Sequence, residues 1–151
     1  MNPYTLVKTR ISETVPYATH TGIELLSVAE GRGEALLPAR DVTLNHIGSQ
    51  HAGALFTLGE AASGAAMAGG FLPVLLSVRP VAANASIQYN KVAKGPIRAS
   101  ATLSEPANTL LASLEASGKT QFTVNVSMRD EADVEVATMQ VDWHVSRAKA
   151  A

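Results

Sequence analysis

The chain of 151 residues contains no cysteine. This absence excludes disulfide bonds, thiolate metal sites and a cysteine nucleophile, and it fits a reducing compartment. Charged residues are also sparse, at 17% of the chain, whereas hydrophobic residues make up 46%. A lightly charged surface leaves more apolar surface for a partner subunit to cover, which is a first indication of self-association.

The sequence also lacks a basic stripe and a long uninterrupted apolar run. Twelve basic and thirteen acidic residues are spread along the chain for a net charge of −1, so nucleic acid is not expected as a partner. Residues 1–10 lack the apolar core of a signal peptide. The longest apolar stretch, residues 61–76, is dominated by Ala and Gly and is interrupted by Pro73, so we expect no membrane span and a cytoplasmic protein.

Three segments are predicted to be helical. Residues 5–14 read as a short helix that stops before Pro16. Residues 51–70 have apolar side chains at helical spacing but are rich in glycine, which costs roughly 1 kcal/mol per residue relative to alanine. We expect close approach of the surrounding backbone to explain this helix. Residues 104–118 form a shorter helix, with Pro106 in its first turn and Gly118 at its C-terminal cap.

Two short strands are expected before the long helix. Residues 22–29 and residues 34–37 flank the tripeptide Gly31-Arg32-Gly33, which favours a hairpin turn. These two segments are therefore predicted to pair as antiparallel neighbours.

Four further strands follow the long helix. Residues 81–89, 97–103 and 121–129 alternate apolar and polar side chains, which is typical of an antiparallel sheet with one buried face. In residues 134–145 the apolar phase shifts, so we expect a bulge or bend near Ala137 and Thr138. In the first of these strands, the apolar set expected on one face is Val81, Ala83, Ala85, Ile87 and Tyr89.

The order of these elements predicts a two-layer α+β domain, in which one long central helix packs against an antiparallel sheet of about six strands. No repeat, low-complexity segment or linker divides the chain. Residues 1–151 are therefore expected to form a single domain, with a short N-terminal helix within residues 1–15 and a core over residues 20–146.

A motif of five residues lies at the start of the long helix: Asn45, Gly48, His51, Gly53 and Glu60. It resembles the signature of the phenylacetyl-CoA-thioesterase-like branch of the hotdog superfamily. That signature has Asn, a Gly three residues later, His-Gly-Gly, and an acidic residue seven positions after the second Gly. Here Ala52 replaces the first Gly of the pair. The resemblance implies a single hotdog domain, and residues 104–118 then lengthen one connection between strands.

The start of the long helix has the chemistry to hold a carbonyl oxygen. Free N–H groups and the positive end of the helix dipole lie at residues 52–54, and Gly53 has no side chain in the way. We therefore expect the Gly53 N–H to donate to the oxyanion that develops on a thioester carbonyl, where one such donor contributes about 3 kcal/mol. The alternative is that Gly53 only permits tight packing of helix against sheet.

Glu60 is the expected catalytic carboxylate. Its neighbours Leu58, Ala61 and Ala62 are apolar, so its charge carries a desolvation cost unless it has partners or a purpose. The resemblance implies a general base for water or a nucleophile that forms a transient anhydride. The alternative is an ordinary exposed glutamate on a helix.

The carboxylate cannot reach Gly53 along one helix, because seven residues span roughly 10 Å. The resemblance implies a homodimer, in which Glu60 of one subunit faces the helix start of the other. Two such dimers can pack into a homotetramer. The implied reaction is hydrolysis of an acyl-CoA, with CoA as part of the substrate and no separate cofactor.

Further polar residues complete the expected site. Asn45 would orient the water or the carbonyl, and His51 would fix the loop by hydrogen bonding rather than act as a base. Ser63 could bond the Glu60 carboxylate or a water, and Gln50 is a candidate without a specific role. The resemblance also implies basic residues near the CoA phosphates, for which Lys91 and Lys94 are the candidates. A last group of apolar residues could line an acyl pocket or simply pack in the core: Phe56, Met67, Phe71, Leu72, Leu75 and Leu76.

Two other functions are compatible with these residues. A hotdog domain can bind acyl-CoA without catalysis. His46 also precedes Glu60 by fourteen residues, a spacing similar to that of hotdog 3-hydroxyacyl dehydratases, although His46 lies in Asn-His-Ile-Gly rather than in a Gly-His-Phe-Pro-type context. No metal site is expected, because no ligand spacing with nearby carboxylates marks any of the four histidines: His20, His46, His51 and His144.

Overall fold

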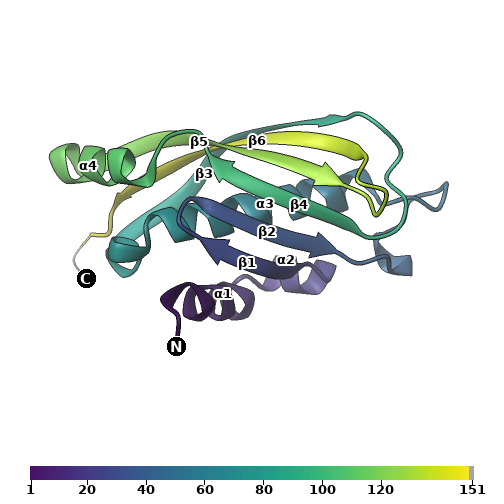
Figure 1. Cartoon of the computed structure of the whole chain (residues 1–151), viewed down its shortest axis with the longest axis horizontal. Coiled ribbons are helices and arrows are strands. Elements are labelled where there is room, and N and C mark those ends of the chain that lie inside the picture. The colour runs from purple at the N-terminus through teal and green to yellow at the C-terminus, as the bar shows by residue number, and fades with distance from the viewer. Residues whose placement is uncertain (150–151) are drawn as a thin grey trace.

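A computed structural model of the chain describes residues 1–149. Six antiparallel strands in the order β1-β2-β4-β5-β6-β3 form one sheet that wraps around the long helix α3 (Figure 1). The α+β class and the single sheet around a central helix are as expected. In chain order the elements are α1 (Pro3–Thr14), α2 (Pro16–Thr21), β1 (Glu24–Ala29), β2 (Arg32–Leu37), the 3-10 turn η1 (Asp41–Thr43), α3 (Ala52–Gly70), the 3-10 segment η2 (Leu72–Ser77), β3 (Val78–Tyr89), β4 (Ile97–Leu103), α4 (Ala107–Ser117), β5 (Lys119–Arg129) and β6 (Glu135–Arg147).

Two helices, rather than one, precede the sheet. The Asn2 side chain caps α1 by accepting a hydrogen bond from the Tyr4 N–H at 2.8 Å. Pro16, expected to stop the first helix, also starts α2, because its fixed φ suits a first helical position and its missing N–H is not needed there. Gly22 ends α2 with a φ of 89°. Neither helix contains a buried residue, so the pair lies on the surface of the domain.

The β1–β2 hairpin is tighter than the sequence suggests. Ala29 pairs with Arg32, so the turn consists of Glu30 and Gly31, with Gly31 at a φ of 67°. The second strand therefore begins two residues earlier than predicted. Gly33 lies inside this strand and not in the turn.

Small residues allow the sheet to approach the backbone of α3. A Cβ atom at Gly33 would lie 2.7 Å from the Ala62 carbonyl oxygen and 2.6 Å from the Ala65 Cβ. A Cβ atom at Gly69 would overlap the carbonyl oxygen of Ala29. Close backbone contact therefore accounts for Gly69 of α3 and for Gly33 of β2 opposite the helix. The expectation holds only in part, because a Cβ atom at Gly59 of α3 would instead meet the side chains of Met128 and Met139.

The edge strand β3 departs from its predicted alternation. Its pairing with β6 shifts between Ala82 and Asn84, so Ala83 forms a bulge. Ala82 pairs with the buried Trp143, whereas Val81 lies on the opposite face of the sheet. The prediction that Val81 and Ala83 share a buried face with the rest of the strand is therefore wrong.

The expected bulge in the last strand is present one residue earlier than predicted. Arg129 pairs with Glu135, and Met128 pairs with Ala137, so Val136 is the extra residue. Val136 and Ala137 are both fully buried, which accounts for the shift in apolar phase.

The predicted helix between β4 and β5 is also present, as α4. Leu110 and Leu114 form its buried stripe, and Gly118 ends it with a φ of 77°. Pro106, predicted to lie in the first turn, instead occupies the N-cap position immediately before it.

Candidate active site

His51 caps the start of α3. Its Nδ1 accepts a hydrogen bond from the Gly53 N–H at 2.8 Å, and its carbonyl accepts one from the Leu55 N–H at 3.0 Å. The Gly53 N–H, expected to hold an oxyanion, therefore already has a partner. The N–H groups of Ala52 and Ala54 have no acceptor among residues 1–149, so the helix start keeps two free donors at the positive end of its dipole.

Asn45 shapes the loop that leads into α3. Its Oδ1 accepts from the N–H groups of Ile47 at 3.0 Å and Ser49 at 3.1 Å, and its Nδ2 donates to the Ser49 Oγ at 2.8 Å. These contacts form a closed Asx-type turn. The side chain is thus committed to the loop itself, and a contact with water or a carbonyl stays a prediction.

Gln50 joins three segments at the base of this loop. Its side chain is 2% exposed and has a partner for each polar atom. Its Oε1 accepts from the Thr43 hydroxyl at 2.8 Å, and its Nε2 donates to the carbonyl oxygens of Pro38 at 3.2 Å and Gly95 at 2.9 Å. The structure therefore gives this substrate-binding candidate a bracing role.

The two candidate lysines lie at the same end of the domain as the start of α3. The Gln50 N–H donates to the Ala93 carbonyl at 2.8 Å, which holds residues 90–96 against the loop. Lys91 and Lys94 are exposed on this segment. Both lysines therefore lie on a segment that contacts the loop before α3.

Tyr89, which was not among the predicted site residues, also contacts the helix start. Its hydroxyl donates to the Ala52 carbonyl at 2.9 Å, and burial raises the pKa of this phenol. The end of β3 is thereby tied to the first residue of α3. Only an aromatic residue at the end of a strand marks this position in the sequence.

Glu60 carries the most perturbed carboxyl group of this region. Its side chain is partly buried, and this burial raises the pKa of the carboxyl above its ordinary value of 4.5. Within residues 1–149, its carboxylate has neither a hydrogen-bond donor nor a cationic partner. It is therefore a base whose lone pairs are not committed to the protein.

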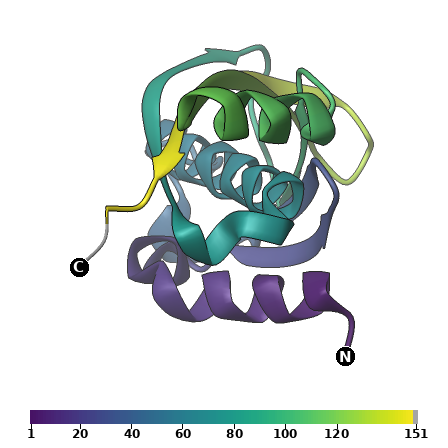
Figure 2. The ribbon, with the colours of Figure 1, turned by 90° about the vertical axis from the view of Figure 1, so that its left-hand side faces the viewer.

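The Glu60 side chain borders a cavity of about 350 Å³. Residues of α1, α2, β1, α3 and η2 are among those that line it. Figure 2 shows α1 and η2 beside one end of α3. Met67, Leu75 and Leu76, three of the residues expected to line an acyl pocket, border the cavity, whereas Phe71 is fully buried in the core.

Ser63 contacts Glu60 differently from the prediction. Its Oγ donates to the backbone carbonyl of Glu60 at 2.7 Å, and it accepts from the Trp143 Nε1–H at 3.1 Å. Its hydroxyl is fully buried, so the expected bond to the Glu60 carboxylate is absent here. Trp143 itself lines the cavity, although nothing local in the sequence marks it as a site residue.

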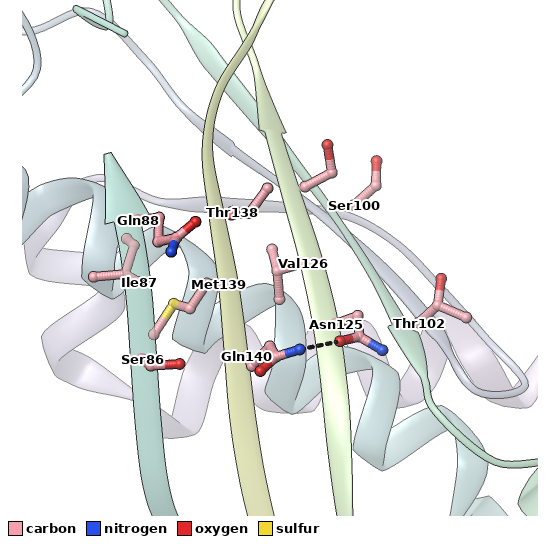
Figure 3. Close-up of a pocket in the computed structure, with 11 residues that line it drawn as sticks. Ser86, Ile87, Gln88, Ser100, Thr102, Asn125, Val126, Thr138, Met139 and Gln140 are labelled. Atoms are coloured by element: carbon pink, nitrogen blue, oxygen red, sulfur yellow. Dashed lines mark hydrogen bonds between the residues drawn. The ribbon is translucent and has the colours of Figure 1, made fainter. Parts of the chain in front are cut away.

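A larger hollow, of about 800 Å³, lies on the outer face of the sheet (Figure 3). Uncharged polar side chains from β3 to β6 line it, and Gln140 donates to Asn125 across it at 3.2 Å. No lining residue is a carboxylate, a histidine or a cation. This hollow therefore lacks a base for hydrolysis, and the Glu60 cavity is the better candidate in spite of its smaller volume.

In the described part of the chain, no group of three or more His, Asp or Glu side chains converges in a way that could hold a metal ion. In the same residues, no helix is both long enough and apolar enough to cross a membrane. The cytoplasmic location is a prediction from the sequence that the structure does not test.

Residues 4–145 match the family described as a domain of unknown function, DUF4442. The chain belongs to the DUF4442 family. No curated protein matches its sequence.

Solved structures similar to this DUF4442 chain share its fold. A protein of unknown function from Pseudomonas aeruginosa, described as a probable thioesterase, is 26% identical, with a TM-score of 0.83 and 95% of each chain covered. The PaaI protein of the phenylacetic acid degradation operon of E. coli is 19% identical, with a TM-score of 0.72, covering 94% of this chain and 91% of PaaI. A mutant thioesterase from Staphylococcus aureus is 16% identical, with a TM-score of 0.72, covering 87% of this chain and 99% of its own. The predicted hotdog fold is confirmed.

Proposed function

We propose that this DUF4442 protein is an acyl-CoA thioesterase that releases free acid and CoA. The observation that carries the proposal is the Glu60 carboxylate, which borders an apolar cavity on α3 without a polar partner in the described chain. The relatives described as thioesterases support the same class of reaction.

In the proposed reaction, Glu60 removes a proton from a water molecule as the water oxygen bonds to the thioester carbonyl carbon. The carbonyl electron pair moves onto oxygen, and N–H groups at the start of α3 stabilise that negative charge. Cleavage of the carbon–sulfur bond then expels the CoA thiolate, which takes up the proton held by Glu60. A raised pKa helps the first step, because it brings the base closer to the operating pH.

Two chains are needed to assemble this site. Gly53 and Glu60 lie roughly 10 Å apart along α3, too far for one bound carbonyl group. In the proposal, Glu60 of one subunit serves the helix start of its partner in a homodimer, and dimers can pair further into a tetramer. The free edge of β3 supports this association, as do three exposed apolar side chains: Phe56 at 37%, Val81 at 39% and Tyr89 at 48% exposure.

The loop before α3 then holds the substrate's thioester end. Lys91 and Lys94 supply positive charge for the CoA phosphates, and Gln50 holds their segment in place from inside the protein. The Gly53 N–H can share its hydrogen with the His51 Nδ1 and the incoming carbonyl oxygen, next to the free donors of Ala52 and Ala54.

Release of the CoA thiol across a panel of acyl-CoA substrates tests the reaction. Wild type and the exposed-helix control Glu115→Gln are expected to be active, and Glu60→Gln is expected to lose about 10²-fold or more in kcat. Tight acyl-CoA binding without turnover by wild type would identify a binding protein instead. Hydration of an enoyl-CoA without thiol release would indicate a dehydratase that uses His46 and Glu60.

Mixing two inactive variants tests the shared site. Glu60→Gln removes the carboxylate, and Gly53→Val obstructs the helix start. A mixed dimer contains one site with both defects and one intact site, so random exchange of subunits is expected to restore roughly a quarter of wild-type activity. No recovery after verified exchange would contradict the two-subunit site.

A further inference from the structure

We propose that the acyl chain of the substrate occupies the cavity beneath α1 and α2, and that these two helices form the wall that limits its length. The inference rests on the thioesterase function proposed above. It adds a substrate class, which is an aliphatic acyl chain of medium length.

The cavity begins at the reacting end of the site and follows one face of α3. Gly64, Met67 and Ala68 lie four, seven and eight positions after Glu60, so they form a continuous helical stripe from the carboxylate. This stripe is roughly 12 Å long at the rise of an α-helix. A chain attached to a carbonyl carbon next to Glu60 can therefore extend along it.

The opposite wall comes from the N-terminal helices. Ile11 of α1, Val15 between the helices and Ala18 of α2 border the cavity, facing the stripe on α3. Among all lining residues only Arg10 and Glu60 carry charge. Most of the cavity is therefore suited to a hydrocarbon rather than to a polar or charged acyl group.

The dimensions of the cavity favour a chain of intermediate length. Its volume of about 350 Å³ is at the small end of ligand sites, which range over about 300–1,000 Å³. An apolar cavity of about 150 Å³ already holds benzene, so a single aromatic ring would leave much of this space empty. Because bonds of about 1.5 Å in a zigzag chain advance it by only about 1.25 Å each, an extended chain of roughly ten carbons matches the 12 Å stripe.

The helical wall is weakly anchored to the rest of the domain. No residue of α1 or α2 is buried, and Val7 and Ile11 are the partly buried hydrophobic residues by which α1 packs on the core. Elements with so little buried apolar surface open at low free-energy cost. The wall can thus separate from α3 to admit a chain and close over it afterwards.

Gly64 is a cavity-lining position on α3 where an added Cβ atom would make only ordinary contacts. A Cβ atom there would lie 3.7 Å from the Trp143 Cζ2, which is ordinary van der Waals contact. At Gly69, by contrast, a Cβ atom would overlap backbone. A larger side chain at position 64 would occupy space next to Trp143 inside the cavity.

Two cavity-filling variants from opposite walls test the proposal: Gly64→Leu and Ala18→Leu. Their matched control is Ala112→Leu, on the exposed face of α4. We would measure kcat/KM for butyryl-, octanoyl-, decanoyl- and palmitoyl-CoA. Wild type and control are expected to prefer octanoyl- or decanoyl-CoA. In both filled variants the ratio of kcat/KM for decanoyl-CoA to kcat/KM for butyryl-CoA is expected to fall about tenfold or more, since each buried methylene contributes about fourfold.

An equal loss for every chain length, or no loss for decanoyl-CoA, would overturn the proposal. Circular dichroism checks folding, and Gly64→Ala provides a milder variant, because its single methyl group makes only ordinary contacts and improves helix propensity.

Binding of non-hydrolysable thioethers separates this inference from the proposed reaction. Calorimetry with S-butyl-CoA and S-decyl-CoA requires no turnover. One outcome is that wild type hydrolyses no acyl-CoA, yet binds S-decyl-CoA more tightly than S-butyl-CoA, and that Gly64→Leu removes this preference. The proposed acyl cavity would then be supported and the thioesterase function contradicted. If wild type hydrolyses acyl-CoA but neither binding nor kcat/KM depends on chain length, the cavity proposal fails alone.

Discussion

The Trp143 indole N–H donates to the Ser63 Oγ across 3.1 Å and so joins β6 to the middle of α3. The Ser63 hydroxyl in turn donates a hydrogen bond to the backbone carbonyl of Glu60 at 2.7 Å. Two consecutive hydrogen bonds therefore connect the sheet to the helical turn that presents the carboxylate. Because Trp143 also borders the cavity, this polar contact sets the shape of the cavity wall.

Substitution Ser63→Ala is expected to destabilise the protein by about 1–3 kcal/mol, because it leaves the Trp143 N–H buried without an acceptor. Urea unfolding measures the loss, with the exposed Ser113→Ala as control. Trp143 is the only tryptophan of the chain, so its fluorescence reports the local change directly. Unchanged stability and emission would show that the hydrogen bond contributes nothing.

Substitution Glu60→Gln is expected to stabilise the protein at neutral pH. Burial raises the folded-state pKa of Glu60 above 4.5, so the folded protein binds more protons than the unfolded chain between these two pKa values. The contribution of Glu60 to the free energy of unfolding therefore falls as the pH rises through this window. The variant's advantage should be present above the folded pKa and vanish below pH 4.5, which thermal unfolding at several pH values can test. An advantage that persists in acid would exclude a titration effect.

The rate of hydrolysis should depend on the same group. A general base must be deprotonated, so kcat/KM is expected to increase with pH, with a midpoint above the ordinary 4.5 of a glutamate. In the variant Glu60→Asp, kcat/KM should still increase with pH, but the midpoint of this increase should move, because a shorter side chain changes the burial of the carboxyl. An unchanged midpoint in this variant would show that another residue is responsible for the pH dependence.

Substitution Gln50→Ala is expected to cost about 3 kcal/mol, because it removes hydrogen bonds to Thr43, Pro38 and Gly95 and leaves buried groups unpaired. The exposed Gln88→Ala is the control. Hydrogen exchange should show the loss concentrated in residues 43–51 and 90–96. Uniform loss across the sheet would indicate that Gln50 does not brace these loops in particular.

Patterns that repeat along the chain predicted most of the fold. The 3.6-residue spacing located α3, and the phase shift in the last strand located the bulge within one residue. The failures have specific physical causes. Pro16 can both end one helix and begin the next, and the bulge at Ala83 reverses which side chains of β3 face inward.

The candidate site was predictable only as far as its motif is local. Asn45, His51, Gly53 and Glu60 lie within sixteen residues, and their positions relative to α3 followed from that spacing. The partners that organise them are distant in sequence. Tyr89 is 37 residues from Ala52, Gly95 is 45 from Gln50, and Trp143 is 80 from Ser63, so no local pattern could reveal these contacts.

The glycines of α3 divide this helix into two sides with different freedom to change. Gly69 of α3 and Gly33 of β2 both meet backbone where helix and sheet pack together, so a single added methyl group has no space there and the sequence on the sheet side is fixed. Gly64 faces the cavity and has space beside Trp143. Substitutions in one narrow stripe of α3, and in the surface helices opposite it, can therefore change the depth of the cavity among this protein's relatives. The packing in the rest of the domain is unaffected by such changes.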